Sequence, residues 1–147
     1  MTEPPKATAM AHLDVWHATG DRFLIDVRGH DLLVDQPLDA GGGDVGPTPT
    51  ELFVASLAAC VGFYAGRFLR RHELPVEGLG VSADFGMSTS GPARVTTIEL
   101  RVSVPVALPE ARRDALMAVV RHCTVHNSLR EVPEVRVELE VPEERAA

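Results

Sequence analysis

The sequence has few cysteines, no excess of positive charge and no long apolar run. Its formal net charge at pH 7 is −7, from 14 Lys and Arg against 21 Asp and Glu. Proteins that bind nucleic acid by neutralising phosphates carry a surplus of Lys and Arg on one face, so no nucleic-acid partner is expected. The length of 147 residues and the composition, 45% hydrophobic and 24% charged, are typical of a single globular domain with one core.

The sequence also lacks the features of secreted and membrane-spanning chains. Residues 1–10 contain no continuous apolar stretch of the kind that a signal peptide requires. The most apolar run, residues 52–66, is shorter than the roughly 20 residues that a bilayer span needs. We therefore expect a cytoplasmic protein with no membrane partner.

Only two cysteines are present, Cys60 and Cys123. The reducing cytosol disfavours permanent disulfides, so a lone pair there is more often redox-active or incidental than structural. The surroundings of the two cysteines must distinguish these possibilities.

Hydrophobic periodicity predicts an α+β domain spanning residues 1–147. Alternation of apolar and polar residues predicts six strands, and helical spacing predicts two helices on either side of the fourth and fifth strands. The expected strands are 12–19, 22–28, 31–35, 79–87, 100–106 and 135–141, and the expected helices are 48–72 and 109–129. The order βββαββαβ fits a mostly antiparallel six-stranded sheet with both helices on one face. Residues 1–11 are expected to be flexible, 37–47 to form a long loop, and 142–147 to be a charged tail.

The first expected helix begins with a capping box. In Thr48-Pro49-Thr50-Glu51 the proline suits the first helical position, and Thr48 and Glu51 have the spacing for reciprocal capping. The next four turns are apolar on nearly every side, which indicates a helix enclosed by protein. One chain with six strands and two helices would not enclose it completely, so we expect a dimer.

Cys60 lies in the middle of this helix, too far from its start to be activated by the helix dipole. A thiol among apolar side chains stays protonated unless a cation is nearby, so a reactive Cys60 needs an arginine or a comparable group beside it. Taken alone, Cys60 and Cys123 can each be read as small buried hydrophobic residues. If the two helices lie side by side, however, the sulfurs can approach closely enough to form a disulfide.

The second expected helix also carries His122 and His126 at i, i+4 spacing around Cys123. This spacing could begin a metal site if the helix persists, but no clear third ligand accompanies it. Hydrogen-bonded or solvated histidines are the preferred interpretation. Glycines 41–43 are not followed by the Gly-Lys-Ser/Thr of a phosphate loop, so they do not indicate a phosphate-binding cofactor. Together with the missing third metal ligand, this means that neither a metal nor a cofactor is expected.

The run Gly46-Pro47-Thr48-Pro49-Thr50-Glu51-Leu52-Phe53, followed by Ala58-Ala59-Cys60, resembles the OsmC/Ohr family of osmotically inducible and organic hydroperoxide resistance proteins. The resemblance covers about residues 12–141 in element order. It implies an intertwined homodimer in which Cys60 is the peroxidatic cysteine, Cys123 the resolving cysteine and Glu51 the family's carboxylate. The catalytic arginine of the family falls in the first hairpin, where Arg22 matches best and Arg28 is a competitor.

The function implied by this resemblance is a thiol-dependent peroxidase. It would reduce organic hydroperoxides through a Cys60 sulfenic acid and a Cys60–Cys123 disulfide, which a dithiol such as a lipoylated protein would reduce. Glu51 and Cys60 are nine residues apart and so on opposite sides of one helix, which predicts that they reach one site only from different chains.

A second function remains open because the family's Cys-Pro-x-Ser pattern is here Cys123-Thr124-Val125-His126. The alternative is a non-catalytic dimer of the same fold that binds a small apolar ligand.

Overall fold

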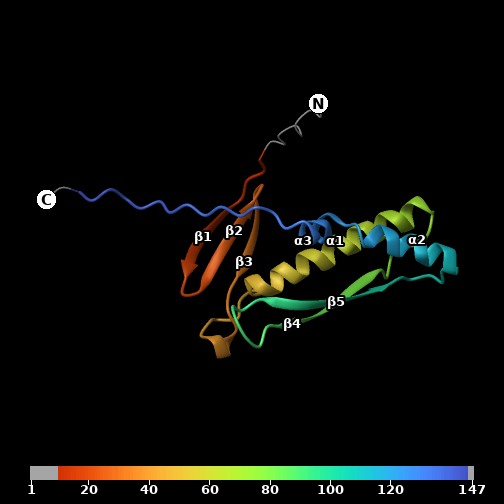
Figure 1. Cartoon of the computed structure of the whole chain (residues 1–147), viewed down its shortest axis with the longest axis horizontal. Helices are drawn as coiled ribbons and strands as arrows, with labels where there is room; N and C mark the ends of the chain where they lie inside the picture. The colour runs from red at the N-terminus through yellow and green to blue at the C-terminus, as the bar shows by residue number, and fades with distance from the viewer. Residues whose placement is uncertain (1–9, 146–147) are drawn as a thin grey trace. The chain divides into compact units, whose positions relative to one another are not determined.

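The computed structural model describes residues 10–145 (Figure 1). They form β1 Asp14–Thr19, β2 Arg22–Val27, β3 His30–Val34, a short 3-10 helix Leu38–Ala40, α1 Pro49–Arg71, β4 Gly80–Met87, β5 Val95–Ser103, α2 Glu110–Val120 and α3 Thr124–Arg130. The chain divides into two compact units, one of residues up to 55 with 85–98, and one of residues 56–84 with those from 99 onward. The expected flexible segment 1–11 and the end of the charged tail fall mostly outside the described residues.

In the first unit, β1, β2 and β3 form an antiparallel sheet in sequence order (Figure 1). A turn at Gly20-Asp21 connects β1 to β2, and the register shifts between His17 and Thr19, next to the start of β2. This irregularity places Arg22 at the first position of β2, opposite Thr19. The three predicted strands of this region are confirmed, with ends displaced by one or two residues.

A tight hairpin joins β2 to β3. Arg28 and Gly29 have φ angles of +52° and +81°, and Val27 pairs with His30 on either side of them. Positive φ at both central residues is the geometry that matches the twist of two-residue hairpins. Asp26 accepts a hydrogen bond from the N–H of Gly29 at 3.0 Å. The prediction that Arg28 continues the strand beside Arg22 is therefore wrong, because β2 ends at Val27.

Helix α1 begins with the predicted capping box. The N–H of Glu51 donates to Oγ1 of Thr48 at 3.1 Å, and the N–H of Thr48 donates to Oε1 of Glu51 at 2.9 Å. The helix is two residues shorter than predicted and ends with Arg70 and Arg71, which are exposed where cations suit the helix dipole.

One side of α1 remains open to solvent in the single chain. Val54, Leu57, Val61, Ala65, Phe68 and Leu69 are buried. By contrast, Phe53 and Phe63 are 42% and 54% exposed. Among the described residues α1 is also the helix that is long and apolar enough to cross a membrane, a test that the core helix of a globular protein passes equally. The chain thus encloses one face of this helix and leaves aromatic surface on the other.

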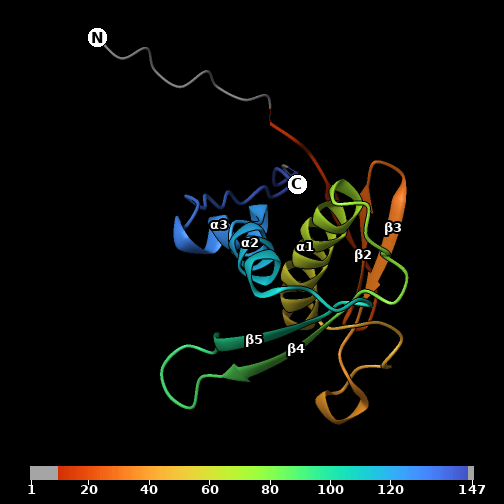
Figure 2. The same cartoon turned by 90° about the vertical axis from the view of Figure 1, so that its right-hand side faces the viewer.

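The second unit packs the later part of α1 closely against the chain that leads into β4. A Cβ added at Gly62 would lie 3.5 Å from Cγ2 of Val81, and one at Gly66 would lie 3.6 Å from Cδ2 of Leu79. Figure 2 shows α2 beside α1. These are ordinary van der Waals distances, so the helix packs closely here without requiring glycine at either position.

The helix predicted over 109–129 is broken into α2 and α3. Cys123 interrupts it with an extended backbone, φ −66° and ψ 153°, and caps α3. Its Sγ accepts the N–H of His126 at 3.4 Å, and its carbonyl oxygen accepts the N–H of Asn127 at 2.9 Å. The prediction of one continuous helix is therefore wrong, and Cys123 stands at a helix start.

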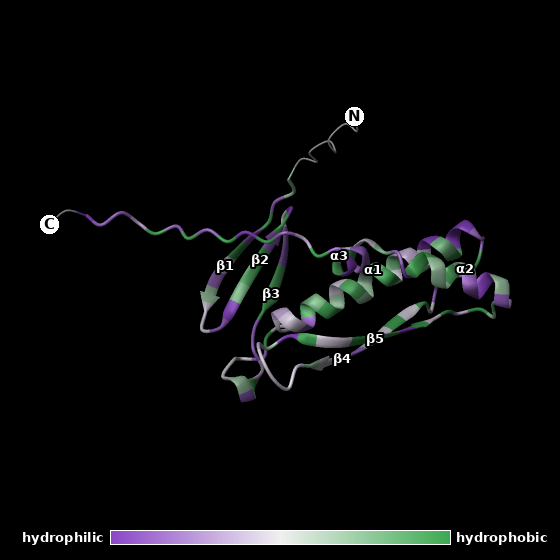
Figure 3. Cartoon of the chain, viewed as in Figure 1, coloured by the Kyte–Doolittle hydropathy of each residue, from purple (hydrophilic) through white to green (hydrophobic). Residues whose placement is uncertain are grey.

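Residues 132–145 are extended but pair with no strand of the described chain. Apolar and polar residues alternate along this segment (Figure 3). Its apolar positions, Val135, Val137, Leu139 and Val141, are 70% to 90% exposed. An extended segment becomes a strand only when a neighbour accepts and donates its backbone hydrogen bonds. The predicted sixth strand is not formed by this single chain, whose described strands make a three-stranded and a two-stranded sheet.

Candidate functional site

The second unit brings the two cysteine thiols together. Cys60 is half-buried on α1, and Cys123 is fully buried at the start of α3. Both are free thiols, and Cys60 is close enough to Cys123 to raise its pKa. The structure therefore brings the two thiols near each other, as expected for helices that lie side by side.

The environment of Cys123 favours the protonated thiol. Burial raises the pKa of Cys123, and the neighbouring Cys60 thiol raises it further. The backbone N–H groups of His126 and Val125 act in the opposite direction without reversing the shift. The thiolate, which is the nucleophilic form of cysteine, is therefore disfavoured at Cys123.

A hydrogen bond beside the cysteines joins their two helices. Oη of Tyr64 lies 3.0 Å from Oγ1 of Thr124. Tyr64 is one turn beyond Cys60 on α1, and Thr124 directly follows Cys123. Sequence reasoning missed this pair, because nothing local connects residues 60 positions apart. The sequence feature that could have suggested this hydrogen bond is that each cysteine has a hydroxyl side chain nearby, Tyr64 one turn after Cys60 and Thr124 directly after Cys123.

A cation lies on the same helix as Cys60. The guanidinium of Arg67 is 5.5 Å from the centre of the Phe63 ring and 5.9 Å from that of Tyr64, within the range of cation–π attraction. Because seven residues are about two helical turns, Arg67 and Cys60 share one side of α1.

Arg22 lies in the first unit and is held by Asp35. Nε of Arg22 donates to Oδ2 of Asp35 at 3.2 Å. Asp35, which is 1% exposed, also accepts the N–H of Gln36 at 2.8 Å, of Gly43 at 3.1 Å and of Val45 at 3.3 Å. A Cβ at Gly43 would collide with the guanidinium of Arg22. The carboxylate thus fixes both the arginine and the glycine-rich loop.

The pKa of Asp35 is held below its usual value. Burial alone would raise it, but the hydrogen bonds from Gln36, Val45, Gly43 and Arg22 together lower it more. Sequence reasoning missed Asp35. An acidic residue directly after an apolar strand and before a glycine-rich loop was the available signal.

Neither of the other two predicted site residues contacts the cysteines through a hydrogen bond or ion pair within residues 10–145. Glu51 serves the capping box, where hydrogen bonds from the N–H and the hydroxyl of Thr48 lower its pKa. Arg28 is exposed in the β2–β3 turn. The ion pair of Arg22 is with Asp35 and not with Glu51.

The histidines near Cys123 do not assemble a metal site in the described part of the chain. The break between α2 and α3 removes the continuous helix that the i, i+4 spacing required, and no group of three His, Cys, Asp or Glu residues there could hold a metal ion. Nδ1 of His122 instead lies 3.3 Å from Nη1 of Arg130. Burial, followed by the charges of Arg130 and His122, lowers the pKa of His126.

Solved structures of several bacterial proteins have the same fold as this chain. A protein from Psychrobacter arcticus named for osmotic stress induction and a detoxification response is 21% identical, with a TM-score of 0.75 over 84% of this chain and 90% of its own. An OsmC-like protein from Mycoplasma pneumoniae is 18% identical, with a TM-score of 0.68 over 84% and 89%. The organic hydroperoxide resistance protein OsmC from Legionella pneumophila is 18% identical, with a TM-score of 0.63 over 85% and 92%.

No curated protein sequence matches the chain. A sequence model of the family described as OsmC-like protein matches residues 41–138, which include α1, both strands that follow it, and both cysteines. This match covers more than half of the chain and agrees with the structural likeness. The chain belongs to the OsmC-like protein family.

Proposed function

We propose that this OsmC-like protein is a thiol-dependent peroxidase that reduces organic hydroperoxides to alcohols. The observation that carries the proposal is the proximity of two free thiols, because Cys60 is close enough to Cys123 to raise its pKa, and this supports a disulfide between α1 and the start of α3. The names of several structural relatives refer to organic hydroperoxide resistance, which agrees with this chemistry.

In the first step the Cys60 thiolate attacks one oxygen of the hydroperoxide. A sulfur–oxygen bond forms as the oxygen–oxygen bond breaks, and the leaving alkoxide takes a proton to become the alcohol. The sulfur is oxidised to a sulfenic acid. Cys60 is half-buried, so its thiol is accessible to a peroxide.

In the second step Cys123 loses its proton and attacks the sulfur of the sulfenic acid. The sulfur–sulfur bond forms, the sulfur–oxygen bond breaks, and water leaves. An external dithiol, such as a lipoylated protein, then exchanges with the disulfide and restores both thiols. A reducing cytoplasm is the compartment in which this cycle operates.

Arg22 is the proposed guanidinium that stabilises the Cys60 thiolate, with Arg28 as the competing candidate. In support of Arg22, its side chain is partly buried and oriented by the ion pair with Asp35. Arg28 projects from an exposed hairpin turn that gives it no such support. In this proposal Asp35 is the carboxylate of the same chain that orients Arg22.

A homodimer is part of the proposal. The exposed aromatic side of α1 and the exposed extended segment 132–145 are two apolar surfaces that a second copy would cover. Glu51 would then reach the site around Cys60 from the other chain.

Consumption of cumene hydroperoxide with dihydrolipoamide as reductant tests the proposal. Wild-type protein is expected to turn over, whereas Cys60→Ser is expected to be inactive. Cys123→Ser is expected to react once with peroxide and then stall. Equal rates for wild type and Cys60→Ser would end the enzyme proposal and favour the non-catalytic ligand-binding alternative.

A further inference from the structure

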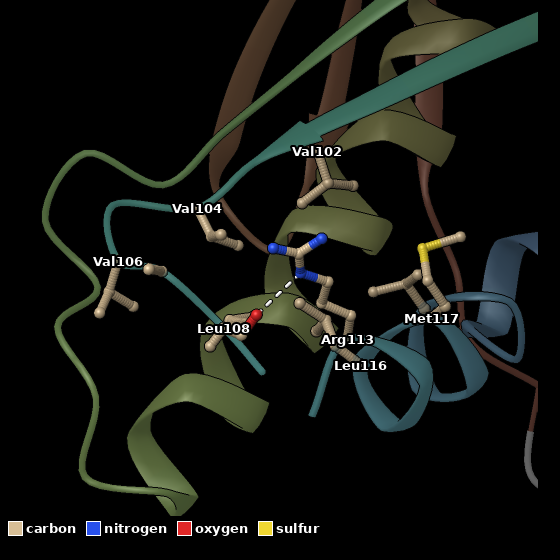
Figure 4. Close-up of a pocket in the computed structure, with 9 residues that line it drawn as sticks. Val102, Val104, Val106, Leu108, Arg113, Leu116 and Met117 are labelled. Carbon is tan, nitrogen blue, oxygen red and sulfur yellow. Dashed lines mark hydrogen bonds between the residues drawn. The ribbon is translucent and has the colours of Figure 1, made fainter. Parts of the chain in front are cut away.

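The second unit contains a cavity that the peroxidase chemistry does not use. It has a volume of about 350 Å³ and lies between the end of β5, the chain that follows it, and α2 (Figure 4). We name it the Arg113 pocket; its walls are Val102, Val104, Val106, Ala107, Leu108, Arg113, Leu116, Met117 and Val120. The volume falls within the range of small-molecule sites, which are mostly apolar with few polar groups.

Arg113 is the single charged residue of this lining. Its Nε donates to the carbonyl oxygen of Leu108 at 2.8 Å, which fixes the plane of the guanidinium. Figure 4 shows the two outer nitrogens directed toward Val102 and Val104, across the pocket. No carboxylate among residues 10–145 forms an ion pair with Arg113. Arg113 is solvent-exposed as a residue, and its oriented guanidinium borders the apolar walls without a counter-ion among residues 10–145.

This combination selects a particular kind of molecule. Apolar walls favour a hydrocarbon body, because its burial removes apolar surface from water. A guanidinium with two free outer nitrogens offers parallel hydrogen bonds to a planar carboxylate. We infer that the Arg113 pocket binds a monocarboxylate with a compact apolar body, of which a medium-chain fatty acid is the simplest example.

The inference goes beyond the peroxidase and does not depend on it. No wall residue is one of the cysteines or one of the residues proposed to activate them. Binding is therefore expected to be the same in Cys60→Ser, so loss of one function leaves the other testable.

Calorimetric titration with octanoate and with octanol at pH 7.5 tests the inference. Octanoate is expected to bind wild type, and Arg113→Gln is expected to bind it about tenfold more weakly because the charged pair is lost. Octanol, which lacks the carboxylate, is expected to bind both proteins equally. Arg112→Gln is the matched control, since Arg112 is an exposed arginine of α2 like Arg113 but lies outside the lining, and it is expected to behave as wild type.

A second variant guards against a folding defect in Arg113→Gln. Met117 is 42% exposed on α2, so Met117→Glu is expected to fold as wild type does, and it puts a negative charge in the wall. It is expected to exclude octanoate. Equal octanoate affinity in wild type, Arg113→Gln and Met117→Glu would overturn the inference, as would no binding to wild type. A change of oligomeric state on adding octanoate would also overturn it, because the pocket would then be an interface between copies.

Discussion

The hydroxyl of Tyr64 lies 3.0 Å from the hydroxyl of Thr124, and this contact ties the helix of Cys60 to the helix that starts at Cys123. Close to this contact, the Cys60 thiol raises the pKa of the Cys123 thiol. The position of one sulfur relative to the other is therefore set by a polar contact as well as by apolar packing.

Removing that contact is expected to slow closure of the disulfide. Tyr64→Phe and Thr124→Val each delete one hydroxyl, at a cost of about 1 kcal/mol, which corresponds to roughly a fivefold slower second step. The measurement is the rate of disulfide formation after one equivalent of cumene hydroperoxide, followed by stopped flow. The first step is the internal control, because attack of Cys60 on peroxide does not require Thr124. Unchanged closure rates in both variants would show that the contact has no such role.

Replacing Asp35 is expected to destabilise the first unit and change its response to acid. Asp35→Asn loses an ionised acceptor that four donors share, so we expect the melting temperature at pH 7 to fall by about 5 °C or more. The folded pKa of Asp35 is lowered, so its contribution is present above its unfolded pKa of about 3.9 and is lost as pH falls through the folded value. The variant should therefore lose less stability than wild type between pH 5 and pH 2.

The control for Asp35→Asn is Asp39→Asn, at an exposed position of the 3-10 helix. It removes the same charge without a buried acceptor, and it is expected to melt as wild type does. Identical pH profiles for Asp35→Asn and Asp39→Asn would contradict the assigned role of Asp35.

The raised pKa of Cys123 predicts a loss of stability at alkaline pH. A group whose folded pKa lies above its unfolded value, about 8.5 for cysteine, stabilises the fold below the unfolded pKa, and this contribution is lost as pH rises through the folded pKa. Under reducing conditions the melting temperature of wild type should fall between pH 8 and pH 10. Cys123→Ala should show a smaller fall, and a fall of equal size would mean that Cys123 does not titrate as the structure indicates.

Glu51 has a capping role in the structure and a catalytic role only in the proposal, and two substitutions separate them. Glutamine can still accept the N–H of Thr48, so Glu51→Gln is expected to keep the melting temperature within a few degrees of wild type. Glu51→Ala loses the reciprocal hydrogen bond and is expected to melt lower. If Glu51 also acts in the site, Glu51→Gln loses peroxidase activity despite its intact fold. Full activity in Glu51→Gln would restrict Glu51 to capping.

The extended segment after α3 is expected to be required for self-association. Ending the chain at Pro133 removes the alternating apolar residues, whereas ending it at Val141 removes only the charged tail. We expect size-exclusion chromatography with light scattering to show a dimer for the full-length protein and for the chain that ends at Val141. The chain that ends at Pro133 is expected to form a weakened dimer. A monomeric full-length protein would contradict the dimer directly.

Features encoded within a few residues of one another were predictable from the sequence. The capping box of Thr48 and Glu51, the turn at Gly20-Asp21 and the alternation along the first three strands all depend on local spacing, and the structure contains each of them. The resemblance around Cys60 also identified the family correctly.

Features that depend on distant or absent neighbours were not predictable in this way. The bond from Arg22 to Asp35 spans 13 positions and that from Tyr64 to Thr124 spans 60, so no periodicity marks them. The segment after α3 has the alternation of a strand, but a strand also needs a neighbour, which one chain does not supply. The backbone of Cys123 is extended, and this breaks the helix. The apolar stripe of the sequence continues across Cys123 and therefore predicted one uninterrupted helix.

Intact-mass spectrometry with peptide mapping, after one equivalent of organic hydroperoxide is added to the reduced protein, tests the sulfur chemistry most directly. A thiol peroxidase of the proposed kind loses the mass of two hydrogens, yields a peptide pair that links Cys60 to Cys123, and gains one oxygen on Cys60 when Cys123 is replaced by serine. Unmodified cysteines, or oxidation confined to methionine, would contradict the proposed reaction.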